Sequence, residues 1–277
     1  MKKIIFVHLL NDFSGSPKVL LQVINACNEN EMPTVLYTGK GTDGFLNNKA
    51  HQHYYYYYKR FDNKILTLLS FFLSQFHLFI KLLKYHNEEV VFYVNTMLPF
   101  GAGLAGKILK KEVIYHIHET SIKPELFKSF LRKVVALTAK KIVFVSNSLK
   151  VLETFNLEKE RVIFNALPIG FLNCVEENNY LNKQNNKDFT ILMACSLRIY
   201  KGILEFLKIA ENCEKTPKIK FQLVLNATDE EVNEFKSKYH IPKNVKIFSK
   251  QEDLHPFYSL ANLVLNLSRI DEWVETF

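Results

Sequence analysis

Two cations stand close together between a predicted strand and a predicted helix in the second half of the chain. The segment runs Ala194-Cys-Ser-Leu-Arg198-Ile-Tyr-Lys201-Gly202. Arg and Lys neutralise phosphates, Arg as a planar fork and Lys as a point charge. A helix start is already the positive end of the helix dipole, so cations stabilise it poorly. Their placement therefore indicates a function, and we predict that Arg198 and Lys201 hold a diphosphate.

The turn after the first predicted strand is polar and contains a glycine. It reads Asn11-Asp-Phe-Ser-Gly15-Ser16-Pro17-Lys18, and a helix is expected to begin near Pro17. Free backbone N–H groups at that helix start could receive a phosphate or a sugar hydroxyl. An ordinary helix cap formed by Ser16 and Pro17 explains the same residues. Both interpretations stay open.

Two histidines, His116 and His118, lie at the end of the fifth predicted strand. From their alternation we expect them to face opposite sides, which argues against a shared metal ion. His116 is expected to be a packed core residue. His118, which precedes Glu119 and Thr120, falls where the strand opens into its loop, and we predict that it faces a ligand.

The segment Gly101-Ala-Gly103-Leu-Ala-Gly106 matches the GxGxxG fingerprint of dinucleotide-binding proteins. In that motif the glycines let pyrophosphate approach a helix start directly after the first strand. Here six residues separate the motif from its strand, which is the fourth in the chain. We therefore favour close packing of a helix on a sheet, and a dinucleotide-dependent oxidoreductase is the weaker alternative.

Strands and helices are expected to alternate along the chain. The first set of strands is predicted at 4–8, 34–37, 53–58, 90–94, 113–118 and 141–146, with helices near 16–29, 63–86, 102–110, 124–139 and 147–155. A second set of strands is predicted at 189–194, 219–225, 245–248 and 263–267, with helices at 201–213, 229–239 and 252–260. Such alternation predicts parallel sheets covered on both faces.

We therefore predict an α/β protein with two Rossmann-like, doubly wound domains. The N-terminal domain spans residues 1–168, a polar linker rich in Asn spans 169–188, and the C-terminal domain spans 189–277. The carboxyl ends of the strands in each domain should face a shared cleft, where open α/β sheets bind ligands.

Composition and charge restrict the function further. The chain has 277 residues, of which 48% are apolar and 23% charged, as in ordinary globular proteins. Its net charge of +8 lies in the N-terminal domain, because residues 1–168 carry 22 Lys and Arg against 13 Asp and Glu. This asymmetry predicts an anionic partner or a solvated basic surface. No nucleic-acid-binding motif accompanies it, and no GxSxG, HExxH or Walker motif occurs.

Four Cys without CxxC spacing make a zinc ribbon or a disulfide scaffold improbable and fit a reduced, cytosolic setting. The stretch from Ile65 to Leu83 has apolar residues at helical spacing. Basic residues flank it at Lys59, Arg60, Lys64, Lys81 and Lys84. A helix buried on the sheet is the favoured interpretation. The alternative is peripheral attachment to anionic lipid, since the polar interruptions argue against a spanning helix.

In their order and spacing these segments resemble the family 4 retaining glycosyltransferases of the GT-B fold. The resemblance extends over the Gly15 loop, Asn95-Thr96, His118-Glu119, Val145–Ser148, Val162–Pro168, the Arg198–Gly202 segment and Asp271–Phe277. It implies an N-terminal domain that receives a glycan or lipid-linked acceptor and a C-terminal domain that binds a nucleotide-sugar. It also implies a cytoplasmic enzyme, which would lie at the inner face of the cell membrane if it attaches to the membrane as a peripheral protein. The resemblance implies no metal or other cofactor and no nucleic-acid partner.

The resemblance also implies roles for individual residues. Arg198 and Lys201 would neutralise the donor diphosphate, whose departure is the demanding part of glycosyl transfer. His118 would contact the donor sugar, and Glu275 would be the first glutamate of the E-x7-E motif, touching the transferred sugar. The loop at Lys250 and Gln251 would hold the base. The acceptor or phosphate loop would comprise Gly15, Ser16 and Asn95.

Two features depart from the family pattern. The Arg-to-Lys spacing of three is shorter than is common, and the second E-x7-E glutamate would fall at position 283, beyond Phe277. We therefore expect a truncated C-terminal domain with strand 263–267 as an apolar sheet edge, poor solubility and impaired transfer. An inactive remnant or a carbohydrate-binding scaffold is the alternative function.

Overall fold

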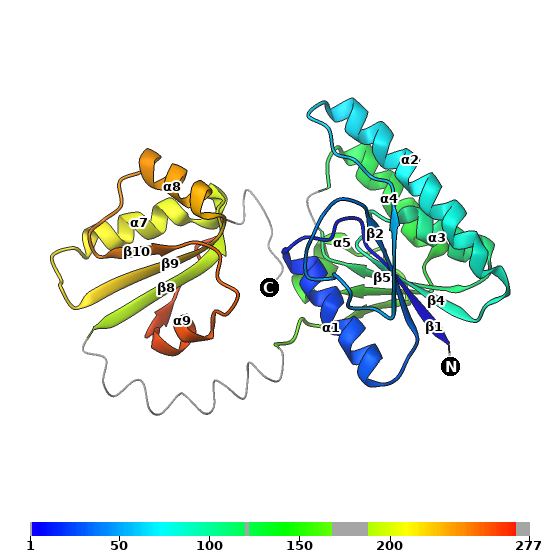
Figure 1. The fold of residues 1–277 in the computed structure, drawn as a ribbon, viewed down its shortest axis with the longest axis horizontal. Helices are drawn as coiled ribbons and strands as arrows, with labels where there is room; N and C mark the ends of the chain where they lie inside the picture. Colours follow the sequence, from blue (N-terminus) through cyan, green and yellow to red (C-terminus); the bar gives the residue numbers. More distant parts are fainter. Residues whose placement is uncertain (1, 120–121, 168–187, 270–277) are drawn as a thin grey trace. The chain divides into compact units, whose positions relative to one another are not determined.

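A computed structural model of the protein describes residues 2–119, 122–167 and 188–269. The chain divides into two compact units, Met1–Asn165 and Ala166–Glu275. Each unit contains one parallel sheet with helices on both of its faces, as Figure 1 shows. The predicted α/β class, with two doubly wound sheets, is confirmed.

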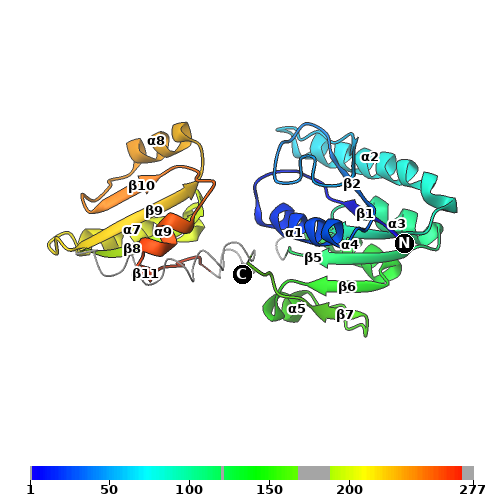
Figure 2. The same cartoon turned by 60° about the horizontal axis from the view of Figure 1, so that its bottom comes forward.

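The N-terminal unit is built on a seven-stranded sheet. Its elements in chain order are β1 (Lys3–Val7), α1 (Gly15–Glu29), β2 (Thr34–Gly39), β3 (Gln52–Tyr56), α2 (Lys64–Leu82), the 3₁₀ helix η1 (Leu83–Asn87), β4 (Val90–Asn95), α3 (Phe100–Ile108), β5 (Glu112–Ile117), α4 (Glu125–Thr138), β6 (Lys141–Phe144), α5 (Asn147–Glu153) and β7 (Glu160–Val162). All strand pairs are parallel, in the order β3-β2-β1-β4-β5-β6-β7. Figure 2 shows β5, β6 and β7 side by side. Strand β7 was not predicted, because three residues that begin with Glu160-Arg161 carry no apolar pattern.

The central strands are continuous apolar runs because helices cover both faces of the sheet. On one face, Phe6 of β1 packs with Leu20 of α1. On the other face, Ile5 and Val7 belong to the large core that also contains Leu78 of α2. Helices α2, α3 and α4 lie side by side over that second face (Figure 1).

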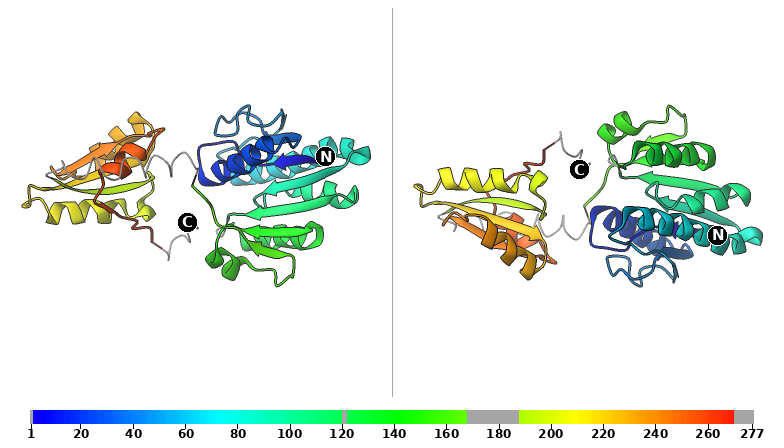
Figure 3. Two further views of the ribbon diagram at one scale, coloured as in Figure 1. Left: turned by 90° about the horizontal axis from the view of Figure 1, so that it is seen from below. Right: turned by 90° about the horizontal axis from the view of Figure 1, so that it is seen from above.

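The C-terminal unit is built on a four-stranded parallel sheet with the order β10-β9-β8-β11. Its elements are β8 (Phe189–Ser196), the 3₁₀ helix η2 (Ile199–Lys201), α7 (Ile203–Asn212), β9 (Ile219–Asn226), α8 (Asp229–Lys238), β10 (Val245–Phe248), α9 (His255–Leu260) and β11 (Leu263–Val264). Helices α7 and α8 share one core on the sheet, and α9 packs in a second, smaller core. Figure 3 shows α7 (yellow) running alongside the strands. Among the described residues strand β11 pairs with β8 alone, and it is shorter than predicted.

The GxGxxG segment lies inside helix α3 rather than in a loop, because α3 begins at Phe100. A Cβ on Gly101 would collide with the backbone carbonyl of Gln75 in α2, and one on Gly103 with the Tyr115 hydroxyl. A Cβ on Gly106 would collide with the Val113 side chain of β5. The glycines therefore let α3 fit between α2 and the sheet, which confirms the packing interpretation.

We expect Gly101→Ala to destabilise the protein by about 1–3 kcal/mol, because α2 and α3 must separate to admit the methyl group. Gly15→Ala is the matched control, since Gly15 also lies in the first turn of a helix and a Cβ there meets open space. Urea unfolding of both variants measures the difference. Equal stability of the two variants would contradict this account of the GxGxxG segment.

Candidate functional site

The carboxyl ends of β1, β4 and β5 lie beside one another because these strands are parallel neighbours. A polar side chain stands at each end. His8 follows β1, Asn95 is the last residue of β4, and His118 follows β5. His8 and Asn95 are buried and His118 is half-buried. The structure thus brings together the predicted residues Asn95 and His118 and adds His8, which was not predicted.

The side chain of Asn95 connects these three segments. Its Nδ2 donates to the carbonyl oxygen of Ser16 at 3.2 Å and lies 3.2 Å from Nδ1 of His8. Its Oδ1 lies 2.9 Å from Nε2 of His118. Because Nδ2 is committed to Ser16, Oδ1 is the acceptor toward His118, and Nε2 of His118 carries the hydrogen. This tautomer leaves Nδ1 of His118 as a hydrogen-bond acceptor.

The two histidines of β5 and its loop lie on the same side, which corrects our expectation that they face opposite sides. Residues i and i+2 of a strand share a face, and the ring centroids of His116 and His118 are 4.3 Å apart. His116 is buried, as expected for a core residue, and its Nδ1 lies 2.8 Å from the Tyr93 hydroxyl. Burial lowers the pKa of His116 to about 4.

The site keeps its histidines uncharged. Burial, followed by the neighbouring His116 and His8, lowers the pKa of His118 to about 2. Burial also lowers the pKa of His8 to about 4, against weaker opposing effects of the Asn95 backbone and Asp12. A neutral imidazole at His118 can accept a hydrogen bond from a sugar hydroxyl at Nδ1, but it cannot supply a positive charge.

Glu119 fixes the loop that follows β4. Its two carboxylate oxygens accept the backbone N–H groups of Met97, at 3.0 Å, and of His118, at 3.1 Å. Burial raises the pKa of Glu119, and these hydrogen bonds oppose the rise. Between β4 and Met97, Thr96 has a φ of 75°, a left-handed conformation that strains a β-branched residue. Strain of this kind is typical of functional sites that the surrounding structure holds in place.

Helix α1 begins at Gly15, two residues earlier than predicted. Its N-cap is Ser14 rather than Ser16. Within the described structure Ser14 makes no side-chain capping bond, and its hydroxyl donates to Asp12 instead. Pro17 has no N–H, and that of Lys18 is bonded to Ser14. The N–H groups of Gly15 and Ser16 therefore remain as the first-turn donors of a 15-residue helix.

The predicted cation pair lies on the loop between β8 and α7. Lys201 N–H donates to the Arg198 carbonyl at 3.0 Å, so the two residues close a single 3₁₀ turn. Helix α7 starts only at Ile203, after Gly202, whose φ of 81° is left-handed. Arg198 is exposed, Lys201 is half-buried, and burial lowers the pKa of Lys201. The spacing of three thus places both cations within one turn directly before a helix.

The segment after β11 holds this turn in place. A Cβ on Gly202 would collide with the backbone and side chain of Leu267. The Arg269 N–H donates to the Tyr200 carbonyl at 2.9 Å, and its Nε lies 3.8 Å from Glu205 of α7. Only glycine fits at position 202 against this segment. The sequence showed the glycine but gave no signal of its partners.

Lys250 and Gln251, the other residues predicted to bind the nucleotide-sugar, follow β10. Lys250 N–H donates to the Ala227 carbonyl at 2.9 Å, which joins this loop to the one after β9. Gln251 Nε2 contacts the Ser249 and Lys250 carbonyls at 3.2 and 3.3 Å. These loops and the Arg198 turn therefore follow three adjacent parallel strands at one sheet edge. Glu275 lies outside the described residues.

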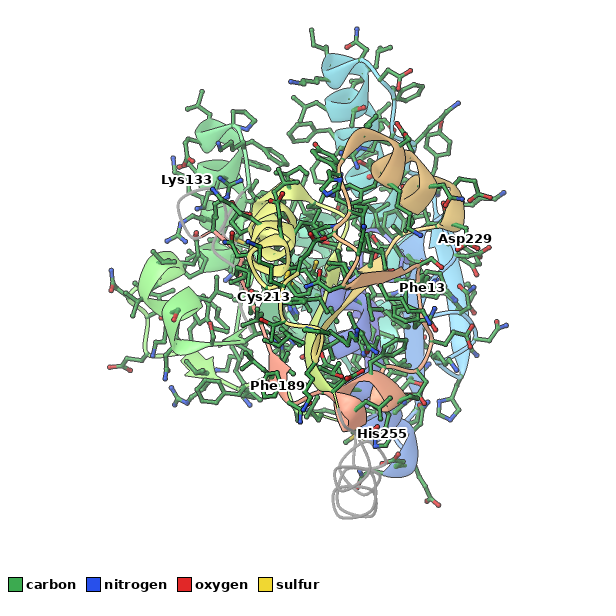
Figure 4. The ribbon with its side chains drawn as sticks, turned by 90° about the vertical axis from the view of Figure 1, so that its left-hand side faces the viewer. Phe13, Lys133, Phe189, Cys213, Asp229 and His255 are labelled. Atoms are coloured by element: carbon green, nitrogen blue, oxygen red, sulfur yellow. The ribbon has the colours of Figure 1, made fainter. Side chains whose placement is uncertain are left out.

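The site contains residues that the sequence analysis missed. These are His8 and Thr96, together with Glu119 in its supporting role. All three residues come after the ends of buried strands, where polar residues are a usable signal. Phe13, labelled in Figure 4, is exposed beside Gly15 and contacts Phe45 with ring centroids 5.1 Å apart. Within the described ranges no group of three or more His, Cys, Asp or Glu residues is placed to hold a metal ion.

No protein family and no curated protein matches the sequence. Solved structures do match the fold. The structure of Anabaena HepE in complex with UDP and glucose has a TM-score of 0.67 at 17% identity, over 96% of this chain and 74% of that one. WaaG, a glycosyltransferase involved in lipopolysaccharide biosynthesis, has a TM-score of 0.59 at 13% identity, over 95% and 73%.

The UDP-GlcNAc 2-epimerase of Neisseria meningitidis, bound to UDP-GlcNAc, also matches, with a TM-score of 0.54 at 14% identity, over 95% and 76%. The protein has the GT-B fold. Because glycosyltransferases and an epimerase share this fold, the reaction must be argued from the residues.

The buried histidines predict how stability depends on pH. The folded-state pKa values of His8, His116 and His118 lie below 6.5, so below that pH the unfolded chain binds protons that the folded chain does not. Stability should therefore fall as pH drops from about 6.5 towards 4, by up to about 1.4 kcal/mol per pH unit for each histidine. His118→Gln should reduce this dependence. His86→Gln, which removes an exposed histidine outside the cluster, is the control for the loss of a histidine. Urea unfolding at pH 7, 6 and 5 measures it, and identical pH dependence in wild type and His118→Gln would contradict the assignment.

Proposed function

We propose that the protein is a glycosyltransferase that moves a sugar from a nucleotide-sugar to a polysaccharide or glycolipid acceptor, with retention of anomeric configuration. The observation that carries the proposal is the turn from Arg198 to Lys201 before α7. Two cations on one turn, at the positive end of a helix, suit the two negative phosphates of a nucleoside diphosphate. The negative charge that develops on the departing diphosphate is the main charge that the enzyme must stabilise in this reaction.

The loops at the same sheet edge supply the rest of the donor site in this proposal. The backbone around Lys250 and Gln251 would contact the nucleotide base. The matched structures that contain UDP or UDP-GlcNAc support uridine diphosphate sugars as the donors to test first. Arg198 and Lys201 would carry the charge neutralisation without a metal ion.

The N-terminal unit would supply the sugar and acceptor contacts. Neutral His118, oriented by Asn95, would bind a hydroxyl of the donor sugar, and Glu275 would touch the transferred sugar, as the family resemblance implies. The N–H groups of Gly15 and Ser16 would bind the acceptor or a phosphate on it. A cytoplasmic location belongs to the proposal, because four Cys without CxxC spacing fit a reduced setting.

Arg198→Ala and Lys201→Ala should each weaken the binding of UDP at least about tenfold. The reason is that a hydrogen bond to a charged group is worth about 1.5–3 kcal/mol. Isothermal titration calorimetry with UDP measures this directly. Lys236→Ala on α8 is the control, because it removes an exposed cation, as Arg198→Ala does, from another element of the same unit.

The same proteins should then be tested for release of UDP from UDP-glucose and UDP-GlcNAc in the presence of glycan acceptors. Turnover in the wild type that is lost in both cation variants supports the transferase. UDP binding without any turnover favours the alternative function, an inactive remnant or a carbohydrate-binding scaffold. Unchanged UDP affinity in both variants would show that the Arg198–Lys201 turn is not the diphosphate site.

A further inference from the structure

Helix α2 packs on the protein through its more polar side. The buried residues of this helix are Ser70, Phe71, Ser74, Gln75, Leu78 and Leu82. Their polar groups have partners inside the unit. Gln75 Oε1 accepts the Gly101 N–H at 3.2 Å, Ser70 Oγ accepts the Lys59 N–H at 3.1 Å, and Ser74 Oγ donates to the Phe71 carbonyl at 2.6 Å. Helix α2 thus covers the sheet, as the favoured interpretation expected, with Phe71, Leu78 and Leu82 in the core. Much of its apolar surface, however, is not buried there.

The apolar side of α2 is exposed. Eight large residues of the helix have between 39% and 77% of their surface accessible, namely Ile65, Leu66, Leu68, Leu69, Phe72, Leu73, Phe76 and Ile80. Side chains of α2 (cyan) project outward at the top of Figure 4. Isolated exposed apolar residues are normal, but a contiguous patch of this kind marks an interaction surface.

The patch continues onto the neighbouring elements. Phe72 contacts Phe130 of α4, with ring centroids 5.9 Å apart, and Phe130 and Leu126 of α4 are themselves exposed. At the other end of α2, Lys81 Nζ donates to the Tyr55 carbonyl at 2.7 Å, and Tyr55 on the edge strand β3 is exposed. Tyrosine is favoured where an apolar layer meets water. We call the exposed face of α2 with Leu126 and Phe130 the α2 surface.

Basic residues stand at both ends of the α2 surface. Lys59, Arg60 and Lys64 precede or begin the helix, and Lys81 and Lys84 lie at its end. Between residues 59 and 84 the only acidic residue is Asp62. A membrane with anionic headgroups matches this pattern, because lipid chains would cover the apolar residues while headgroups pair with the cations.

A second copy of the chain does not match the pattern. In a two-fold contact through α2 the helices run antiparallel or parallel. The antiparallel arrangement places the Lys59–Lys64 end against the Lys81–Lys84 end, and the parallel arrangement places like ends together. Cations face cations in both, so the charges oppose self-association and favour an anionic partner.

The packing of α2 favours a helix that lies on a membrane over one that crosses it. The stretch Lys64–Asn87 is long and apolar enough to cross a bilayer. An 18-residue window within it has a mean hydropathy of 1.7, but 33% of that window is buried within the protein. Its buried side packs on α3 through the Gln75–Gly101 contact. We propose that the α2 surface is a docking site for an anionic lipid bilayer, with α2 in the headgroup region. This proposal holds whether or not the chain transfers sugar.

Vesicle sedimentation of the full chain tests the proposal. Wild type should bind vesicles of phosphatidylcholine with phosphatidylglycerol at low salt, and should bind phosphatidylcholine vesicles at least tenfold more weakly. The triple variant Leu69→Ser/Leu73→Ser/Phe76→Ser should lower the partition coefficient at least tenfold, because these residues are more than half exposed and carry the apolar contact. Lys59→Gln and Lys64→Gln should each lower it about fivefold.

The double variant Val151→Ser/Leu152→Ser is the matched control. It removes equally exposed apolar residues from α5, outside the α2 surface, and should bind as wild type does. Melting temperatures of all variants verify that they are folded. Three results would overturn the proposal. The first is wild-type binding with no preference for anionic vesicles. The second is a loss of vesicle binding in the control variant equal to that in the triple variant. The third is a dimer of the wild type in light scattering, with the triple variant monomeric.

Discussion

The side-chain amide of Asn95 determines how the N-terminal unit presents its polar residues. It contacts Ser16 in the first turn of α1, His8 after β1 and His118 after β5, segments that lie 79, 87 and 23 residues away in the chain. The amide is fully buried, so an unpaired donor or acceptor would cost about 1–3 kcal/mol. The loops after β1, β4 and β5 therefore hold one another in place. The start of α1 and the ring of His118 are set relative to each other before any ligand binds, which is the preorganisation that binding and catalysis require.

The C-terminal unit positions its cations through the backbone instead. Gly202 adopts a left-handed conformation that closes the Arg198–Lys201 turn, and the Leu267 backbone occupies the space that any larger residue would need. Arg198 and Lys201 are long cationic side chains on a turn fixed by the backbone, a suitable arrangement for binding a diphosphate. The N-terminal unit thus contains an uncharged cluster that can bind hydroxyl groups, and the C-terminal unit contains a positive turn that can neutralise phosphate. This division of roles is the physical basis of the proposed transfer from a nucleotide-sugar.

Much of the fold could be predicted from the sequence, because buried parallel strands such as Ile4–Val7 are continuous apolar runs separated by helical segments. The Arg198–Lys201 pair could be selected as a candidate because cations are unfavourable at a helix start. Long-range contacts were not predictable. Nothing local shows that Asn95 meets Ser16, and the exposed side of α2 could not be chosen from its periodicity, because apolar residues occur all round that helix. The opposite-face expectation for His116 and His118 was wrong because it misapplied the two-residue period of a strand.

The tautomer of His118 tests the central role of Asn95 most directly. Nitrogen-15 NMR of histidine-labelled protein, with His118 assigned through His118→Gln, reports which ring nitrogen carries the hydrogen. We expect a neutral ring protonated at Nε2 at pH 7, with no change down to pH 5, and loss of this single tautomer in Asn95→Ala. A ring protonated at Nδ1, or one that becomes cationic with a pKa near 6.5, would contradict the account of a neutral His118 oriented by Asn95.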